Sequence, residues 1–310
     1  MIEKAAPRIN GVLSPVVTPF KPDYSPDAER FVRHCQWLLS NHVGLAVFGT
    51  NSEGNSLSVE ERMALLEKLV EAGLDTARMM PGTGCCSLSD SVRLSSHAVK
   101  LGCAGVLMLP PFYYKGVSDE GLYRNYAQVI EKVGDARLRI YLYQIPPVSH
   151  VAISVALIER LLKHYPRNIA GIKDTSGDWN YTKTVLDAFA GTGFDVFAGT
   201  ETILLATMRG GGAGCISATA NVNPGPIHRL FDSWDGADAD AQQENLNAIR
   251  LVFQNYPMIP ALKQAIANWS ADPGWAKVRP PLVELSDDQA TALIAALKKR
   301  GFNMAGLQGK

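Results

Sequence analysis

The stretch Ile169-Ala170-Gly171-Ile172-Lys173-Asp174-Thr175-Ser176-Gly177 carries more information than any other segment of the chain. A short apolar run ends in a lysine, and small polar residues follow, which predicts a buried strand with Lys173 at its C-terminal end. Burying an unpaired ammonium group is costly, whereas a low-dielectric site favours the neutral, nucleophilic amine. The stretch therefore indicates either a Schiff-base lysine or a strand-end lysine that reaches solvent beside Asp174. By itself it favours the second interpretation.

The composition limits the class of protein. Of the 310 residues, 46% are hydrophobic, which is enough for one large α/β barrel or for two small domains. The formal net charge is zero and no basic stripe is present, which argues against a nucleic-acid partner. Met1–Asn10 lacks the apolar region of a secretory signal, and no apolar stretch approaches the roughly 18 residues of a membrane span. We therefore expect a cytoplasmic protein that binds neither nucleic acid nor membrane.

The cysteines and histidines indicate neither a disulfide framework nor a metal site. The five cysteines are odd in number and form no CxxC pair, and the six histidines show no HExxH or similar ligand spacing. We expect reduced thiols, as in a cytoplasmic protein, and no bound metal.

Strand-like and helix-like segments alternate outward from this stretch in both directions. Eight short apolar segments bounded by Gly, Pro, Ser or Thr predict strands: 11–20, 45–50, 78–84, 105–111, 139–146, 169–175, 195–200 and 214–221. Helices are predicted between them over 58–73, 89–100, 119–133, 154–165 and 181–189, the first opened by the capping box Ser58-Val59-Glu60-Glu61. Eight such units predict an α/β fold of the (β/α)8 TIM-barrel class. An open doubly wound sheet is the alternative, but the first strand leads into Thr18-Pro19-Phe20 and not into a glycine fingerprint.

The pattern changes after residue 221. Four further segments predict helices, over 224–234, 239–254, 258–269 and 287–299, which is more than barrel closure needs. We expect residues 1–234 to form the barrel with the active site and residues 235–310 to form a C-terminal helical extension. No flexible linker separates the two parts.

Reacting groups of such a barrel gather where its strands end. The predicted strand ends contain one lysine, several hydroxyls and tyrosines, and little negative charge; they are Gly49-Thr50-Asn51-Ser52-Glu53-Gly54, Gly82-Thr83-Gly84, Pro111-Phe112-Tyr113-Tyr114, Tyr143-Gln144-Ile145-Pro146, Lys173, Gly199-Thr200-Glu201 and Ser217-Ala218-Thr219.

Four of these elements resemble the pyruvate-dependent class I aldolase and lyase superfamily, which includes dihydrodipicolinate synthase and N-acetylneuraminate lyase. They are Gly49-Thr50-x-x-Glu53, Tyr143-x-x-Pro146, Gly171-x-Lys173-Asp174 and Ser217-x-Thr219-Ala220-Asn221, each on the expected strand and in the expected order. The resemblance covers roughly residues 11 to 224, and a weaker similarity extends to Val278-Arg279-Pro280-Pro281-Leu282. Together these four elements favour a Schiff-base lysine over a strand-end lysine that reaches solvent.

The resemblance implies roles for the residues at the barrel mouth. Lys173 forms an imine with the ketone of a 2-oxo acid, so that a carbanion at C3 is stabilised as an enamine and a C–C bond is made or cleaved. Tyr143 is the acid/base, a role for which a nearby cation helps a phenol of pKa about 10 to ionise. No metal or organic cofactor is needed, because the lysine supplies the electron sink.

The same resemblance implies where the substrate binds. Gly49, Thr50 and Asn51 hold the substrate carboxylate through backbone N–H groups and a hydroxyl, and Gly199 and Ile216 line the substrate site. Many relatives have two adjacent hydroxyl residues at this turn, whereas Asn51 stands at the second position here. Asparagine can donate to a carboxylate but is a poor proton relay.

Tyr113 matches a tyrosine that reaches into the neighbouring subunit's site in relatives and passes protons there. The resemblance therefore implies a homo-oligomer, a tetramer built as a dimer of dimers. An aromatic loop packed on its own barrel is the alternative interpretation of Phe112-Tyr113-Tyr114.

Val148 departs from the pattern of dihydrodipicolinate synthases, which have an arginine at this position to bind the second substrate's carboxylate. An apolar side chain removes that charge-assisted contact. We therefore expect a lyase or aldolase that acts on pyruvate or on a hydroxy- or deoxy-2-oxo acid. The alternatives are a true dihydrodipicolinate synthase with its cation supplied from elsewhere, a phosphosugar-binding isomerase and a non-catalytic ligand-binding barrel.

Overall fold

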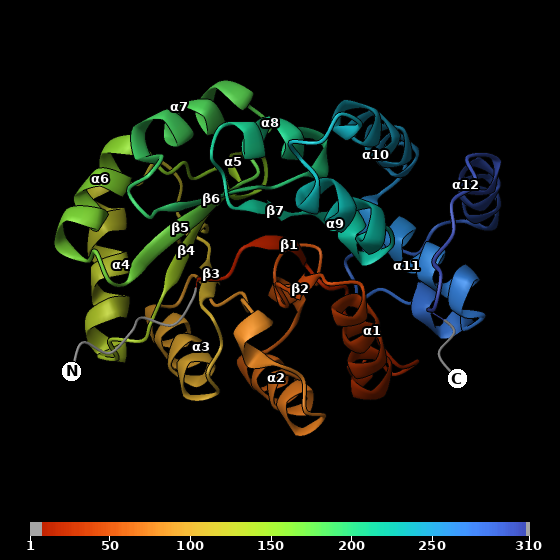
Figure 1. Cartoon of the computed structure of the whole chain (residues 1–310). Helices are drawn as coiled ribbons and strands as arrows, with labels where there is room; N and C mark the ends of the chain where they lie inside the picture. The colour runs from red at the N-terminus through yellow and green to blue at the C-terminus, as the bar shows by residue number, and fades with distance from the viewer. Residues whose placement is uncertain (1–7, 308–310) are drawn as a thin grey trace.

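The computed structural model describes residues 8–307, so most of the segment considered above as a possible secretory signal lies outside the described residues. Seven parallel strands form one sheet in the order β2-β1-β7-β6-β5-β4-β3. Helices surround these strands (Figure 1). The strands are β1 (Gly11–Ser14), β2 (Gly44–Leu45), β3 (Val106–Met108), β4 (Ile140–Gln144), β5 (Ile169–Asp174), β6 (Asp195–Ala198) and β7 (Gly214–Ile216).

The segment predicted as the third strand is reduced to a bridge between the two edges of this sheet. Met79 pairs in parallel with Leu45 of β2, and Gly82 pairs in parallel with Leu107 of β3. Between them, Pro81 lacks an N–H group and cannot donate to a ladder, although its carbonyl accepts from the backbone of Leu107 at 2.9 Å. The segment thus links β2 to β3 and closes the curled sheet into a barrel.

The remaining strands are also shorter than predicted, because their C-terminal parts leave the sheet. The segment predicted over 11–20 is a strand only to Ser14, and residues Ala218–Asn221, predicted within the last strand, form a 3-10 helix. After β4, Pro146 opens the short helix α5 (Pro146–Ser149). These departures place the polar ends of the predicted strands in loops at the mouth of the barrel.

Most of the outer helices agree with the sequence pattern. The capping box at Ser58 is present and opens α2 (Val59–Glu71). The other predicted helices appear as α3 (Leu88–Lys100), α4 (Asp119–Val133), α6 (Val155–His164) and α7 (Trp179–Phe189). Two further helices, α1 (Ala28–Ser40) and α8 (Leu204–Arg209), were not predicted. Asp27, which caps α1 by accepting from the backbone of Arg30, is the signal that could have located the first of them.

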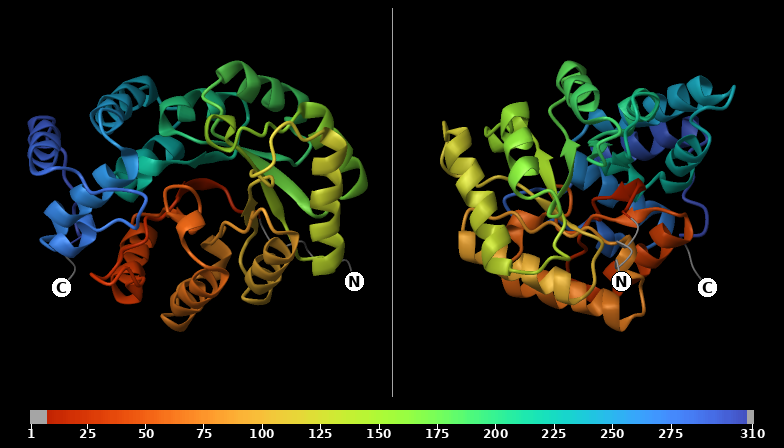
Figure 2. Two further views of the ribbon diagram at one scale, coloured as in Figure 1. Left: turned by 180° about the vertical axis from the view of Figure 1, so that it is seen from behind. Right: turned by 60° about the vertical axis from the view of Figure 1, so that its left-hand side comes forward.

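Four helices follow the last strand, as predicted: α9 (Pro224–Asp232), α10 (Ala239–Gln254), α11 (Met258–Ser270) and α12 (Asp287–Lys299). Helices α10 to α12 lie together on one side of the barrel (Figures 1 and 2). Their apolar residues belong to the same buried cluster as residues of the barrel, for example Phe253 and Leu262 with Phe31 and Val47. No helix within residues 8–307 is long and apolar enough to cross a membrane.

The inside of the barrel holds a separate apolar cluster to which most strands contribute. Its buried members are Ile9, Leu13, Ala46, Met80, Leu107, Tyr141, Tyr143, Ile145, Ala170, Phe197 and Ile216. Inward-pointing residues of parallel strands fill such a barrel in layers. Tyr143 lies near the C-terminal end of β4, so its hydroxyl is carried on a packed and rigid support.

Candidate active site

Lys173 and Tyr143 lie side by side on neighbouring strands. They are register partners in the β4–β5 pair. The Nζ atom of Lys173 donates to the hydroxyl of Tyr143 at 3.2 Å and lies 4.2 Å from the centroid of its ring. Both residues are only 2% exposed. The Lys173 amine is therefore buried against a phenol and an aromatic face and does not extend into solvent.

Asp174 does not pair with this lysine. Its carboxylate accepts from the backbone and hydroxyl of Ser176 at 2.9 and 3.0 Å and from the hydroxyl of Thr182 at 2.5 Å. Burial raises the pKa of Asp174, and these hydrogen bonds oppose that shift. The alternative of an exposed strand-end lysine beside Asp174 is therefore wrong.

Thr50 meets Tyr143 from the other side. The Thr50 hydroxyl lies 3.2 Å from the Tyr143 hydroxyl, so the phenol oxygen contacts both Thr50 and Lys173. Thr50 belongs to the turn after β2, in which the amides of Ser52 and Gly54 both donate to the carbonyl of Gly49 at 3.1 Å. The three groups therefore form a continuous chain of proton donors and acceptors from the turn to the lysine.

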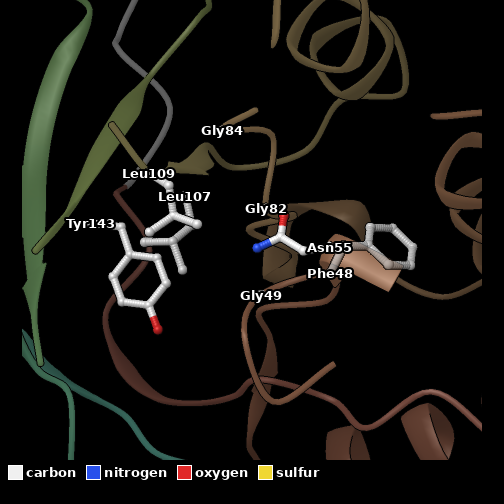
Figure 3. Close-up of a pocket in the computed structure, with 8 residues that line it drawn as sticks. All are labelled: Phe48, Gly49, Asn55, Gly82, Gly84, Leu107, Leu109 and Tyr143. Carbon is white, nitrogen blue, oxygen red and sulfur yellow. The ribbon is translucent and has the colours of Figure 1, made fainter. Parts of the chain in front are cut away.

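Tyr143 helps to line a small cavity (Figure 3). It measures about 10 Å³, which is about the room that one water molecule needs. Its walls are Phe48, Gly49, Asn55, Gly82, Gly84, Leu107, Leu109 and Tyr143. Asn55 was not predicted at the site, because it lies two residues beyond the end of the motif Gly49-Thr50-x-x-Glu53.

The loops after β6 and β7 add a buried polar network. The Glu201 carboxylate accepts from the hydroxyls of Ser217 and Thr219, and Arg250 of α10 contacts it at 3.3 Å. The network borders β7, and the charges of Glu201, Lys173 and Arg250 all act on the buried Cys215 thiol of that strand, whose pKa burial raises. Arg250 was not predicted, since nothing in the local sequence of α10 marks it.

Gly199 and Ile216, predicted to line the substrate site, lie at the ends of β6 and β7. The backbone of Gly199 donates to the carbonyl of Asp174 at 2.7 Å. A side chain here would meet the Thr175 hydroxyl and the Asp174 carbonyl at 2.1 and 2.5 Å, so this close approach requires glycine. Ile216 is fully buried inside the barrel.

Two predicted site residues are not brought to the lysine within this chain. Tyr113 is 73% exposed and packs edge-on against Tyr114, with 5.3 Å between the ring centroids. Val148 is 59% exposed on α5. Lys115 donates to the carbonyl of Ser149 at 2.9 Å and so ties the Tyr113 loop to α5.

No group of three or more His, Cys, Asp or Glu side chains in residues 8–307 is arranged to hold a metal ion. The donors at the site are instead one amine, one phenol, one hydroxyl and backbone amides. Such a set fits nucleophilic and proton-transfer chemistry on a carbonyl substrate.

Known proteins match this chain along almost all of its length. The model of the dihydrodipicolinate synthetase family matches residues 8–300. An uncharacterized DapA-like lyase of Chloroflexus aurantiacus is 33% identical over 95% of this chain and 97% of its own length. A 4-hydroxy-tetrahydrodipicolinate synthase of Methanococcoides burtonii is 30% identical over 94% and 98% of the two chains.

Solved structures agree with these matches. The dihydrodipicolinate synthase of Agrobacterium tumefaciens superposes with a TM-score of 0.87 and 30% identity, over 94% of this chain and 99% of its own. The prophage protein YagE of E. coli, solved in complex with pyruvate, superposes with a TM-score of 0.86 and 28% identity, over 95% and 99% of the two chains.

Proposed function

The chain belongs to the dihydrodipicolinate synthetase family and is a carbon–carbon lyase, and from this premise we propose that it makes or cleaves a C–C bond next to a 2-oxo acid through a Schiff base on Lys173. The observation that carries the proposal is the position of the Tyr143 hydroxyl, which is 3.2 Å from both the Lys173 amine and the Thr50 hydroxyl. A nucleophile and an acid/base within hydrogen-bond reach, with the base held by a third group, are typical of covalent catalysis.

The reaction begins when the neutral amine of Lys173 attacks the ketone carbon of the substrate. One proton of the amine moves to the carbonyl oxygen and Tyr143 donates a second, so that the oxygen leaves as water and a protonated imine forms. The imine withdraws electrons from C3, so that either a C3 proton or a C3–C4 bond can be lost and an enamine results. Tyr143 then receives or returns the proton, and Thr50 exchanges protons with it across their 3.2 Å contact.

The substrate carboxylate is bound by the turn after β2. The turn Gly49–Gly54 offers the Thr50 hydroxyl, which lies 3.2 Å from the Tyr143 hydroxyl, and the backbone amides of Thr50 and Asn51. The amides that follow them, from Ser52 to Gly54, already donate to carbonyls within the turn. Oriented amides bind an anion without a fixed cation. Asn51 supplies an amide where many relatives supply a second hydroxyl, which leaves Thr50 as the proton-relaying group of the turn. Gly199 and Ile216 complete the walls beside the lysine.

The second substrate is proposed to be an uncharged aldehyde, or the corresponding part of a hydroxy- or deoxy-2-oxo acid. Val148 offers no charge to a second carboxylate. The Arg250 guanidinium lies near the site, but its ion pair with Glu201 uses its charge. The alternative is 4-hydroxy-tetrahydrodipicolinate synthesis from pyruvate and aspartate semialdehyde, the activity for which the M. burtonii relative is named. This alternative would require a cation for the second carboxylate, so Arg250 would have to give up its ion pair with Glu201 or another cation would have to take that place.

The proposal also covers the oligomeric state and the cellular compartment of the enzyme. The exposed Tyr113 is proposed to enter the site of a neighbouring copy in a homotetramer, and residues 235–310 to act as a helical extension of the barrel. All five cysteines are free thiols, which fits an enzyme of the reducing cytoplasm. The lysine acts as the electron sink, so the proposed reaction uses no organic cofactor.

Steady-state kinetics with two aldehydes test the substrate class. With pyruvate as donor, kcat/KM for a neutral hydroxyaldehyde should exceed kcat/KM for aspartate semialdehyde. Val148→Arg should shift this ratio towards aspartate semialdehyde by about 10- to 150-fold, since a charge-assisted hydrogen bond contributes about 1.5–3 kcal/mol. Val148→Leu is the matched control and should leave the ratio unchanged. Efficient use of aspartate semialdehyde by the unmodified enzyme would establish the alternative.

A further inference from the structure

Two non-glycine residues in the turn after β2 have left-handed backbone conformations. Phe48 has a φ of 65° and Glu53 a φ of 54°. Side chains disfavour this region, so such residues persist only where the surrounding structure imposes them. Thr50 lies between the two, and the amide of Glu53 donates to the Thr50 carbonyl at 3.1 Å. Whatever fixes Glu53 therefore also fixes the residue that faces Tyr143.

The Glu53 carboxylate is fixed by the C-terminal part of the chain, through helix α11 and the segment that precedes α12. The ammonium group of Lys263, on α11, contacts one carboxylate oxygen. The backbone amide of Arg279 donates to the other oxygen at 2.9 Å. Lys263 is itself held by the carbonyl of Lys277 at 2.8 Å. These contacts join positions 210 and 226 residues apart in the sequence.

The Glu53–Lys263 pair is fully enclosed, and the side chains of both partners are 0% exposed. Burial lowers the pKa of Lys263 to about 8, and Glu53 opposes that shift. Removing two charges from water costs about as much as their attraction returns, so a buried ion pair is weak evidence for a role in stability. The pair does fix the orientation of the Glu53 side chain, because each carboxylate oxygen contacts a donor that is itself held in place.

We propose that Glu53 and Lys263 are a pair of positioning residues for the active site: through them, helix α11 holds the turn Gly49–Gly54 in the conformation that binds the substrate carboxylate and places Thr50 against Tyr143. The inference rests on the proposed function, in which this turn binds the 2-oxo acid. Neither residue touches the substrate; both act through the turn.

The test compares KM for pyruvate in the unmodified enzyme and in Lys263→Met, which keeps a long side chain and removes the ammonium group. KM should rise about 10-fold or more, the factor that corresponds to about 1.4 kcal/mol of lost binding. A merely structural role would reduce the fraction of active enzyme, and with it kcat, while KM stayed the same. The active fraction is counted separately by borohydride trapping of the pyruvate adduct.

The double variant Lys263→Met/Glu53→Gln separates positioning from stability. It leaves no unpaired charge in the interior, so it should fold and melt closer to the unmodified protein than the single variant does. Its KM should nevertheless stay raised, because the glutamine amide can no longer accept with both of its terminal atoms. If the single variant does not fold, KM for pyruvate is compared between the double variant and the unmodified enzyme.

Arg30→Met is the matched control. Arg30 also joins the barrel to the C-terminal part, through hydrogen bonds of 2.6 and 2.8 Å to Asp272, and its other ion pair goes to Asp27. The variant should lose stability and keep KM within twofold of the unmodified value.

A KM within twofold in both Lys263 variants, beside normal trapping in the unmodified protein, would overturn the positioning role and leave the proposed function standing. A lack of trapping in the unmodified protein would overturn both.

Discussion

The phenol oxygen of Tyr143 is the point at which the proposed chemistry converges. It contacts the Lys173 amine and the Thr50 hydroxyl, each at 3.2 Å. The ring is held inside the barrel by the packing of β4, so the hydroxyl has little freedom to leave these two partners. Removing the oxygen alone therefore isolates proton transfer from substrate positioning.

Tyr143→Phe should lower kcat by about 10²- to 10⁴-fold, the usual contribution of a general acid/base. The aromatic ring remains, so the buried packing and the melting temperature should change little. The measurement is steady-state turnover of the best 2-oxo acid, with thermal melting as the check on folding. A kcat near that of the unmodified enzyme in a folded variant would remove Tyr143 from the mechanism.

The sequence located Lys173, Tyr143 and Thr50 at the ends of predicted strands, and strand ends of a parallel barrel meet on one face. The family resemblance then singled out these three residues. The sequence did not predict the ion-pair partners Lys263 and Arg250. Both lie on helices whose periodic pattern is satisfied by their apolar residues, and their partners Glu53 and Glu201 come from loops far away in the chain. Local patterns carry no information on such long-range pairs.

At the scale of elements, the sequence predicted where strands begin better than where they end. Predicted strands such as 214–221 contain the strand and the loop that follows, since small residues such as Ser217 and Ala218 fit either. The segment predicted as the third strand, 78–84, forms only isolated bridges with its neighbours, in part because Pro81 has no N–H group to donate to a ladder. The helices agreed more closely, because capping residues such as Ser58 and Ser154 mark their starts.

Helix α1 carries a buried histidine that makes the folded chain sensitive to acid. The imidazole of His34 is fully buried between Trp37 and Trp275, with ring centroids 5.6 and 5.1 Å away. Burial lowers its pKa to about 4, and a contact with Asn221 opposes the shift. Because the unfolded chain binds a proton at about 6.5 and the folded chain only near 4, the free energy of unfolding falls as pH drops through this window.

His34→Phe should remove that part of the acid sensitivity. Between pH 7.5 and pH 5, the unmodified protein should lose about 2 kcal/mol more of its unfolding free energy than the variant does. Urea unfolding at the two pH values, compared between the two proteins, gives this difference. An equal loss in both proteins would show that His34 does not titrate in this way.

At the scale of the whole molecule, the site is proposed to be completed by a second copy of the chain. Tyr113 and Tyr114 are 73% and 74% exposed, and Lys115 holds their loop against α5. Large aromatic side chains on a tied loop are typical of an interface. A tyrosine that acts only in the partner's site need not contact the lysine of its own chain. The exposed position of Tyr113 is compatible with such a role.

Mixed assemblies test this arrangement. Tyr113→Phe and Lys173→Ala chains should each have little activity when assembled alone. In mixed dimers, one of the two sites combines an intact Lys173 with an intact Tyr113 from its partner, so random mixing should restore about a quarter of the sites. Unmixed samples of each variant at the same total concentration are the control. A mixture no more active than the average of its components would place Tyr113 outside the partner's site.

The proposed reaction depends on an imine at Lys173, and borohydride reduction traps such an imine as a stable adduct. The protein is incubated with pyruvate and borohydride, digested, and the modified peptide is located by mass mapping. We expect a stable reduced adduct on Lys173 in the unmodified protein and none at this position in a folded Lys173→Ala variant. An adduct on another lysine, or no adduct on a folded unmodified protein, would show that Lys173 does not form the imine.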